Sequence, residues 1–293
     1  MPFGSEMRIG IGLPAQLPGA TPEFVLEWAR KADKGPFSCL SLIDRLVYPN
    51  YEPLIALTAA AAVTQRVGLM TAVLLVPLRN TGILAKEVAT LDVISHGRLI
   101  LGIGVGGRED DFRAAPAPFR GRGKRLEEQI AVMRRIWSGQ LVADDVGPIG
   151  PRPVQEGGPP LLIGGFASVV LRRAGRLADG YLSGGADPAT VQSMYRSVEE
   201  AWHASGRPGK PRLVVGSSYA LGPNSQHRGA SFLRDYYRFQ GPGAEGMVQR
   251  LLSSPEAIRR RVQEYADIGV DELVLWPTVA EPEQLDRLAD VVG

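Results

Sequence analysis

The sequence predicts an α/β fold: a closed barrel of eight parallel β-strands, each followed by a helix, in one domain covering residues 1–293. Short apolar runs rich in leucine, isoleucine and valine alternate with amphipathic stretches along the whole chain, which is typical of a parallel sheet. Eight such units in 293 residues suit the size of a (β/α)8 TIM barrel. No low-complexity segment divides the chain into halves. An open doubly wound sheet is the alternative.

The first half of the chain shows the alternation most clearly. Residues 8–13 form a short apolar run closed by Pro14. A helix then begins at Pro22, because a threonine cap at Thr21 followed by proline favours a helix start. Gly97 ends the last helix of this half. Further strands are expected at residues 37–43, 67–76 and 98–104, and further helices at residues 53–63 and 80–95.

The second half follows the same order less regularly. Residues 105–120 are expected as an irregular loop inserted after the fourth strand. Residues 227–252 are expected as helical pieces broken by Gly241-Pro242-Gly243. Strands are expected at residues 161–163, 180–183, 212–219 and 272–276, and helices at residues 121–138, 168–177, 188–204, 255–268 and 282–291.

Composition excludes several classes of protein. A formal net charge of +2 argues against non-specific nucleic-acid binding, which needs a concentrated basic field. The single Cys39 excludes an intramolecular disulfide and a cysteine-based metal centre, and His96, His203 and His227 lack metal-ligand spacing, so we predict no metal site. No apolar run approaches the roughly 20 residues that span a bilayer, and the start shows no secretory signal. We therefore expect a cytoplasmic protein without nucleic-acid or membrane partners.

One glycine-rich run matches the spacing of a dinucleotide-binding loop. It is Gly102-Ile103-Gly104-Val105-Gly106-Gly107, directly after the fourth strand. We reject that interpretation because such a loop opens a helix at once, whereas residues 108–118 are expected to be a loop. Two interpretations remain open: the glycines let a flat ligand approach the backbone, or they relieve crowding inside the barrel.

A second glycine-containing segment joins the fifth strand to a helix. Its residues are Gly164, Gly165, Phe166, Ala167 and Ser168. Free backbone N–H groups and a hydroxyl at a helix N-terminus suit a phosphate. The alternative is a glycine turn in which Ser168 only caps the helix.

Charged residues also lie where the barrel's chemistry is expected. Asp44 and Arg45 end the second strand, at the face that carries active sites in such barrels, so both are candidate catalytic residues. The alternative is a weak ion pair at the rim. Glu109, Asp110 and Asp111 offer an acid or base, but a charge run usually faces solvent, which we expect for at least two of them.

Taken together, these residues resemble the luciferase-like monooxygenase family, barrel enzymes that use reduced FMN or the deazaflavin coenzyme F420. The longest similar run is Leu84-Ala85-Lys86 followed by Ala89-Thr90-Leu91-Asp92-Val93-Ile94-Ser95-His96-Gly97-Arg98-Leu99-Ile100-Leu101-Gly102-Ile103-Gly104-Val105-Gly106. Shorter ones are Asp44-Arg45-Leu46, Thr71-Ala72-Val73-Leu74-Leu75, Leu162-Ile163-Gly164-Gly165 and Ala178-Asp179-Gly180. The resemblance is weakest over residues 222–253.

The resemblance implies an oxidoreductase that uses F420 or FMN for hydride transfer or monooxygenation of a small organic substrate. It implies that the cofactor ring lies near Asp44, Ala72, Val73 and residues 104–107, and that the phosphate lies at residues 164–168. It also implies a non-proline cis peptide bond between Ala72 and Val73. Alternatives from other classes are a phosphate-binding barrel isomerase or lyase without a redox cofactor, and a non-catalytic flavin-binding relative.

Two positions depart from the pattern that the resemblance implies. Many members carry His after the strand-two Asp, where this chain has Arg45, and the sugar-phosphate dehydrogenases carry Glu where Gly107 stands. An arginine is no general base at neutral pH, so Arg45 does not take over the proton transfer assigned to that His. A sugar-phosphate dehydrogenase is therefore not expected.

The choice of cofactor depends on charge. F420 extends beyond its phosphate into a lactyl and oligoglutamate tail, whereas FMN ends at the phosphate. A basic cluster in and after the inserted loop favours F420 slightly, because it would screen the carboxylates of that tail. The alternative is a solvated lid. The cluster consists of Arg108, Arg113, Arg120, Arg122, Lys124 and Arg125.

Two helices carry more apolar residues than one buried stripe requires. They are the expected helices at residues 53–63 and 80–95. Such an excess leaves a face for a partner, so we expect a homodimer. The alternative is that both helices are simply well packed on the barrel.

Overall fold

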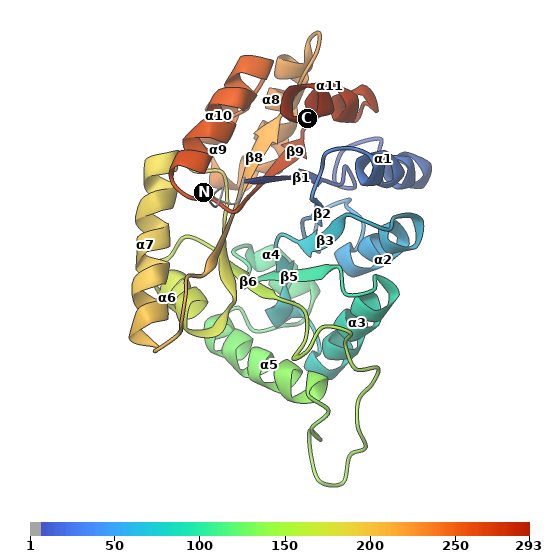
Figure 1. The fold of residues 1–293 in the computed structure, drawn as a ribbon, viewed down its shortest axis with the longest axis vertical. Coiled ribbons are helices and arrows are strands. Elements are labelled where there is room, and N and C mark those ends of the chain that lie inside the picture. Colours follow the sequence, from blue (N-terminus) through green and yellow to red (C-terminus); the bar gives the residue numbers. More distant parts are fainter. Residues whose placement is uncertain (1–6) are drawn as a thin grey trace, which may run out of the picture.

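The computed structural model describes residues 7–293 and shows a closed parallel barrel (Figure 1). Its strands run in the order β3, β2, β1, β9, β8, β7, β6, β5, and pairing of β3 with β5 closes the sheet. The predicted barrel is confirmed. The strands are β1 (Arg8–Gly12), β2 (Cys39–Leu42), β3 (Gly68–Thr71), β4 (Leu74–Leu75), β5 (Leu99–Gly104), β6 (Leu161–Gly164), β7 (Gly180–Ser183), β8 (Arg212–Tyr219) and β9 (Glu272–Pro277).

Helices surround the strands (Figure 1). The expected start of α1 is confirmed, since the Thr21 hydroxyl accepts a hydrogen bond from the Phe24 N–H at 3.2 Å. The helices are α1 (Pro22–Lys34), α2 (Pro53–Val63), α3 (Thr81–Ile94), α4 (Glu109–Ala114), α5 (Arg122–Trp137), α6 (Ser168–Leu177), α7 (Pro188–Ala204), α8 (Ser225–Tyr236), α9 (Gly243–Gln249), α10 (Pro255–Asp267) and α11 (Glu283–Val292). Short 3-10 turns lie at η1 (Val76–Leu78) and η2 (Arg238–Gln240).

The third barrel strand is split where one continuous strand was expected. β3 and β4 are separated by Ala72 and Val73, and both segments pair with β5. The peptide bond between Ala72 and Val73 is cis, as the resemblance implied. Ala72 and Val73 lie outside both strand segments, although the Ala72 N–H still donates a hydrogen bond to the Leu42 carbonyl of β2 at 2.8 Å.

One expectation about the inserted loop is wrong. Residues 109–114, expected as loop, form helix α4. Glu109 and Asp110 lie in its first turn, where the helix dipole favours carboxylates, and Phe112 is only 2% exposed. A helix thus follows the Gly102–Gly107 run closely, so the expected absence of a helix there is wrong and gives no ground against a dinucleotide loop. The closed barrel excludes the doubly wound sheet instead.

Much of the Leu84–Gly106 run serves the fold rather than a site. Asp92 is fully buried and accepts hydrogen bonds from the backbone N–H groups of Val154 and Gln155, at 2.8 and 3.0 Å. These bonds hold the irregular segment after α5, which projects from the lower end of the molecule in Figure 1. Arg98 donates hydrogen bonds to carbonyl oxygens near the end of α2, including that of Val67 at 2.9 Å.

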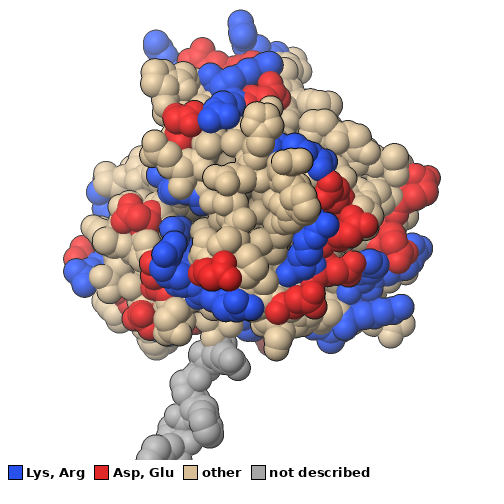
Figure 2. Space-filling view, turned by 90° about the horizontal axis from the view of Figure 1, so that it is seen from above, with Lys and Arg blue, Asp and Glu red and all other residues tan. Residues whose placement is uncertain are grey.

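Three features of the described residues relate to the predicted absence of membrane, metal and nucleic-acid binding. Within residues 7–293, no helix is both long and apolar enough to cross a membrane. The same residues hold no group of three or more His, Cys, Asp or Glu side chains placed to bind a metal ion, and His96, His203 and His227 are exposed. On the face shown in Figure 2, basic and acidic side chains lie beside one another instead of forming a field of one sign.

The apolar faces of α2 and α3 generate a prediction about assembly. The side chains of Ile55 and Ile83, on these two adjacent helices, are 72% and 61% exposed. We expect a homodimer by light scattering at micromolar concentration, and the double variant Ile55→Glu with Ile83→Glu should be a monomer, because two buried carboxylates oppose association. Leu141→Glu, on the loop after α5, is the control and should leave the mass unchanged. A monomer mass for the unsubstituted protein would contradict the expectation.

Candidate functional site

A cavity of about 550 Å³ opens at the carboxyl ends of the strands. We call it the large cavity. Loops after β2, β3, β5 and β6 form its walls, together with residues from the end of α8 and from η2. Twelve of the predicted site residues line it: Asp44, Arg45, Ala72, Val73, Gly104, Val105, Gly106, Gly107, Gly164, Gly165, Phe166 and Ala167. The structure thus brings together segments that the sequence placed on separate strand ends.

The floor of the large cavity depends on two glycines. A Cβ on Gly104 would lie 2.6 Å from one methyl group of Val73, and a Cβ on Gly164 would lie 2.7 Å from the other. Neither position accommodates a side chain while Val73 stays in place. At Gly107, by contrast, a Cβ would meet nothing within 4 Å. Of the two interpretations left open by the sequence, relief of crowding therefore applies to Gly104, whereas Gly107 has open space beside it and the approach of a ligand there stays a prediction.

The segment before α6 presents a helix N-terminus to the large cavity. Gly165, Phe166 and Ala167 line the cavity, and Gly165 has a φ of +140°, a backbone conformation that favours glycine. Ala167 is the N-cap and has no side chain able to accept a hydrogen bond. Its carbonyl accepts the Val170 N–H at 2.7 Å, so the N–H groups of Ser168 and Val169 are the ones left without a cap. Ser168, predicted to bind the phosphate or, in the alternative, only to cap the helix, is the first helical residue and does not line the cavity, so the alternative of a Ser168 cap is wrong.

Asp44 is held at the cavity wall by two donors on one oxygen. Its Oδ2 accepts hydrogen bonds from the Leu75 N–H and from Arg79, both at 2.9 Å. Arg79 also bonds Glu52 at 2.7 Å, which ties the start of α2 to the site. Burial raises the pKa of the Asp44 carboxyl above its usual value, and the Arg79 guanidinium and the Leu75 N–H oppose this rise.

Arg45 and Asp44 do not pair with one another, so the alternative of a rim ion pair between them is wrong. Arg45 instead pairs with Asp111 on α4 at 2.8 Å, and both side chains are almost completely buried. The other oxygen of Asp111 accepts the N–H groups of Leu46 and Val47. This cluster fixes the loop after β2 against α4. Removing one member of such a buried pair costs about 3–5 kcal/mol, so Arg45 is at least a structural residue.

The other acidic residues of α4 differ in exposure. Glu109 is exposed, and the side chain of Asp110 is 43% exposed and lies 3.3 Å from Arg45. The expectation that at least two of the three carboxylates face solvent fits Glu109 and, in part, Asp110.

Sequence reasoning missed an aromatic wall at the end of α8. Tyr236, Tyr237 and Phe239 line the large cavity, and the Arg108 guanidinium lies 3.7 Å from the centre of the Phe239 ring. Burial raises the pKa of Tyr237 to about 12 and raises that of Tyr236 further, so both hydroxyls stay protonated at neutral pH and are able to donate hydrogen bonds. The run of aromatic residues at 236–239 was the available signal, in the segment where the resemblance is weakest.

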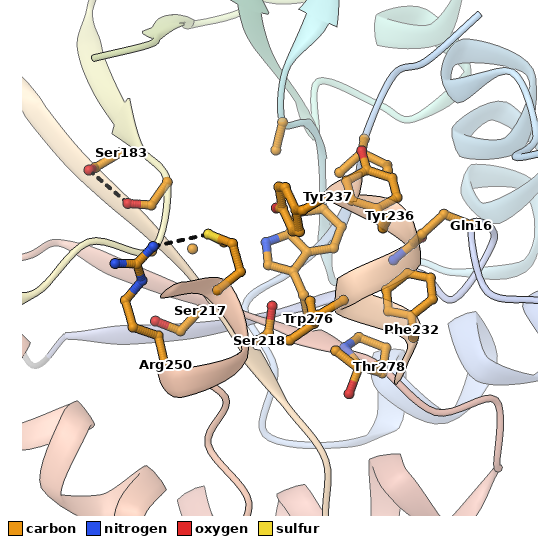
Figure 3. Close-up of a pocket in the computed structure, with 18 of the residues that line it drawn as sticks. Gln16, Ser183, Ser217, Ser218, Phe232, Tyr236, Tyr237, Arg250, Trp276 and Thr278 are labelled. Atoms are coloured by element: carbon orange, nitrogen blue, oxygen red, sulfur yellow. Dashed lines mark hydrogen bonds between the residues drawn. The ribbon is translucent and has the colours of Figure 1, made fainter. Parts of the chain in front are cut away.

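A second cavity, of about 140 Å³, adjoins the large one. We call it the small cavity. Ala72, Tyr236 and Tyr237 line both cavities. Figure 3 shows Trp276 near the middle of the small cavity, with Arg250, Ser183 and Ser217 to one side and Gln16, Phe232 and Thr278 to the other. The two cavities together offer a broad space and a narrow one that meet at the tyrosines.

Comparisons with known sequences found a matching family and several relatives. The profile of a family described as luciferase-like monooxygenase matches residues 1–292. An uncharacterized protein of Mycobacterium tuberculosis (strain ATCC 25618 / H37Rv) is 33% identical over 182 residues, which are 60% of this chain and 64% of that protein. An F420-dependent glucose-6-phosphate dehydrogenase of Nocardia farcinica is 28% identical over 221 residues, 70% of this chain and 61% of that protein. Each match spans less than two thirds of the relative's length.

Solved structures share the fold. An F420-dependent secondary alcohol dehydrogenase in complex with an F420-acetone adduct has a TM-score of 0.84 at 18% identity, over 98% of both chains. The oxygenating constituent of 3,6-diketocamphane monooxygenase from Pseudomonas putida, in complex with FMN, has a TM-score of 0.71 at 16% identity, over 92% of this chain and 91% of that chain. At these identities the likeness concerns the fold alone.

The N-cap of α6 allows a clean test of the expected phosphate position. Ala167→Asp introduces a preferred N-cap residue, which stabilises the helix by about 1 kcal/mol, and sets a carboxylate among the donors for a phosphate. Its FMN affinity, measured by quenching of flavin fluorescence, should fall at least about tenfold, or about 1.4 kcal/mol. Ala167→Asn, an uncharged cap of the same shape, is the matched control and should lose less. Equal FMN affinity in both variants and the unsubstituted protein would show that the phosphate binds elsewhere. Gly165 is unsuitable for this test because its φ strains any side chain.

Proposed function

Because the chain belongs to the luciferase-like monooxygenase family, we propose that it is an oxidoreductase that binds F420 or reduced FMN in the large cavity and acts on a small organic substrate. The observation that supports this most is the junction of an open, glycine-edged cavity with an uncapped helix N-terminus. Such a site offers a flat ring a close approach to the backbone, and it offers a phosphate several N–H donors.

The residues present fit such a cofactor. A volume of about 550 Å³ lies within the usual range for small-molecule sites, about 300–1,000 Å³. In our proposal the ring lies over Ala72 and Val73, beside Asp44, and the phosphate accepts hydrogen bonds from the N–H groups that begin α6. A phosphate-binding isomerase or lyase would need only the second of these features.

Four charged or polar wall residues have a proposed task. When bound in its reduced form, the cofactor would supply a hydride or, with oxygen as the oxidant, the two electrons that a monooxygenation consumes. The network with Arg79 orients Asp44 toward the ring, and Arg45 adds a positive charge fixed by Asp111. Arg45 holds its proton at neutral pH, so it transfers none. Tyr236 and Tyr237 hold protons where the two cavities meet, and we assign to them hydrogen bonds to a substrate oxygen.

The basic start of α5 supports F420 over FMN. Arg122 donates a hydrogen bond to the Gly106 carbonyl at 3.0 Å, which brings this helix end to the edge of the large cavity. The side chain of Lys124 is 86% exposed, and Arg120 is exposed as well. These cations would screen the carboxylates of an oligoglutamate tail, which FMN lacks.

The charge argument gives a salt-dependent test with F420 and FMN as titrants. F420 should bind more tightly than FMN at low salt and should weaken more as salt shortens the Debye length from about 10 to 3 Å. The triple variant Arg120→Gln, Lys124→Gln and Arg125→Gln should remove that difference. Arg122 stays intact, because its bonds to the carbonyls of Gly106 and Phe119 shape the cavity edge.

Three outcomes would count against parts of the proposal. Failure of both cofactors to bind below about millimolar concentration, a free energy near −4.1 kcal/mol, would contradict the oxidoreductase itself. Tighter binding of FMN at low salt, or turnover with reduced FMN and oxygen alone, would contradict the choice of F420 and favour a monooxygenase. An unchanged salt dependence of F420 affinity in the triple variant would show that the oligoglutamate tail binds away from α5.

A further inference from the structure

The small cavity has polar atoms that the described part of the protein leaves without partners. Ser217 is 5% exposed and Gln16 is 4% exposed, yet neither Ser217 Oγ nor Gln16 Oε1 has a hydrogen-bond partner among residues 7–293. Both residues line the small cavity. An unpaired buried polar group costs about 1–3 kcal/mol, so the Ser217 hydroxyl indicates a ligand that accepts its hydrogen bond, whereas Gln16 Oε1, an acceptor on the other side of Trp276 in Figure 3, would need a separate donor.

Arg250 brings a positive charge to the same cavity. It follows the last turn of α9, and its Nη2 lies 3.1 Å from Met247 Sδ, a weak acceptor. Among residues 7–293 it forms no ion pair. The nearby carboxylate of Asp187 caps α7, and hydrogen bonds from Thr190 are the main reason that its pKa is lowered, with Arg250 adding a smaller effect. Figure 3 shows Arg250 on the same side of Trp276 as Ser217. A guanidinium and a free hydroxyl together suit a carboxylate.

The volume of the small cavity and the residues that line it constrain the size and shape of the rest of the ligand. A protein cavity of about 150 Å³ holds a benzene molecule, and this one measures about 140 Å³. Trp276, Phe232 and Tyr237 supply aromatic walls, which favour a flat apolar body. Tyr236 and Tyr237 also line the large cavity, so the reacting end of a substrate has to lie beside them.

We propose that the substrate is a small carboxylate with a body about the size of one six-membered ring, and that Arg250 and Ser217 bind its carboxylate in the small cavity. The proposal rests on the proposed function for the reaction itself, but the binding site stands on Arg250, Ser217 and the cavity. Arg250 does not line the large cavity, so it should determine substrate affinity and leave cofactor affinity unchanged.

The test uses benzoate as the probe and benzamide as its neutral isostere, titrated into the full-length protein with and without saturating F420 or FMN. Binding is read calorimetrically and by tryptophan fluorescence, since Trp276 lines the cavity and the other three tryptophans are buried elsewhere. Benzoate should bind at least about tenfold more tightly than benzamide, as expected for a charge-assisted hydrogen-bonded pair. Trp276→Phe should abolish the fluorescence change.

Variants at position 250 test whether the guanidinium causes the preference for benzoate over benzamide. Arg250→Gln should weaken benzoate binding at least about tenfold, while benzamide and cofactor affinities stay within about twofold. Arg250→Lys, which keeps the charge, should recover part of the loss. Ser217→Ala should also weaken benzoate binding, by a smaller factor, because it removes one neutral hydrogen bond. The side chain of Arg250 is exposed, so these changes should leave the fold intact.

The outcomes separate this inference from the proposed function. Equal affinity for benzoate and benzamide, or an Arg250→Gln variant with unchanged benzoate affinity, overturns the inference even when F420 binds. Benzoate binding that depends on Arg250 in a protein that binds neither F420 nor FMN supports the site and overturns the oxidoreductase. Loss of cofactor affinity in Arg250→Gln would contradict the placement of Arg250 outside the large cavity.

Discussion

The position of the Val73 side chain is the constraint on which the candidate site depends. Val73 lies in the break between β3 and β4, and its two methyl groups point at Gly104 on β5 and Gly164 on β6. A side chain at either glycine would collide with Val73. The missing Cβ atoms therefore let three neighbouring strands meet at one point, and this point is the floor of the large cavity.

The charges of the large cavity are mostly paired with one another before any ligand binds. Asp44 is held by Arg79, and Arg45 is held by Asp111. Groups fixed in this way need little reorganisation when charge changes on a bound molecule, which is the usual basis of electrostatic preorganisation. Arg250 differs, since within the described chain it has no carboxylate partner. The small cavity consequently keeps a charge available for a ligand.

The long run that resembles the luciferase-like family combines structural and functional residues. Asp92 and Arg98 form hydrogen bonds with distant backbone groups and hold a loop and a helix end in place. Only the last part of the run, from Gly104 onward, reaches the large cavity. Resemblance in such a run therefore indicates the fold strongly and the reaction weakly, because most of its side chains never contact a ligand.

The order and type of most elements, and the loops that carry the site, follow from local patterns in the amino-acid sequence. Strand and helix periodicity is a local property of the chain, and so are the glycines that end β5 and β6. The pairing of Arg45 with Asp111, and the presence of Tyr236, Tyr237 and Arg250 at the cavities, became evident from the folded chain. The folded chain also shows that residues 109–114 are helical, where Asp111 bonds the loop after β2. These features depend on contacts between residues far apart in the chain, which no local pattern records.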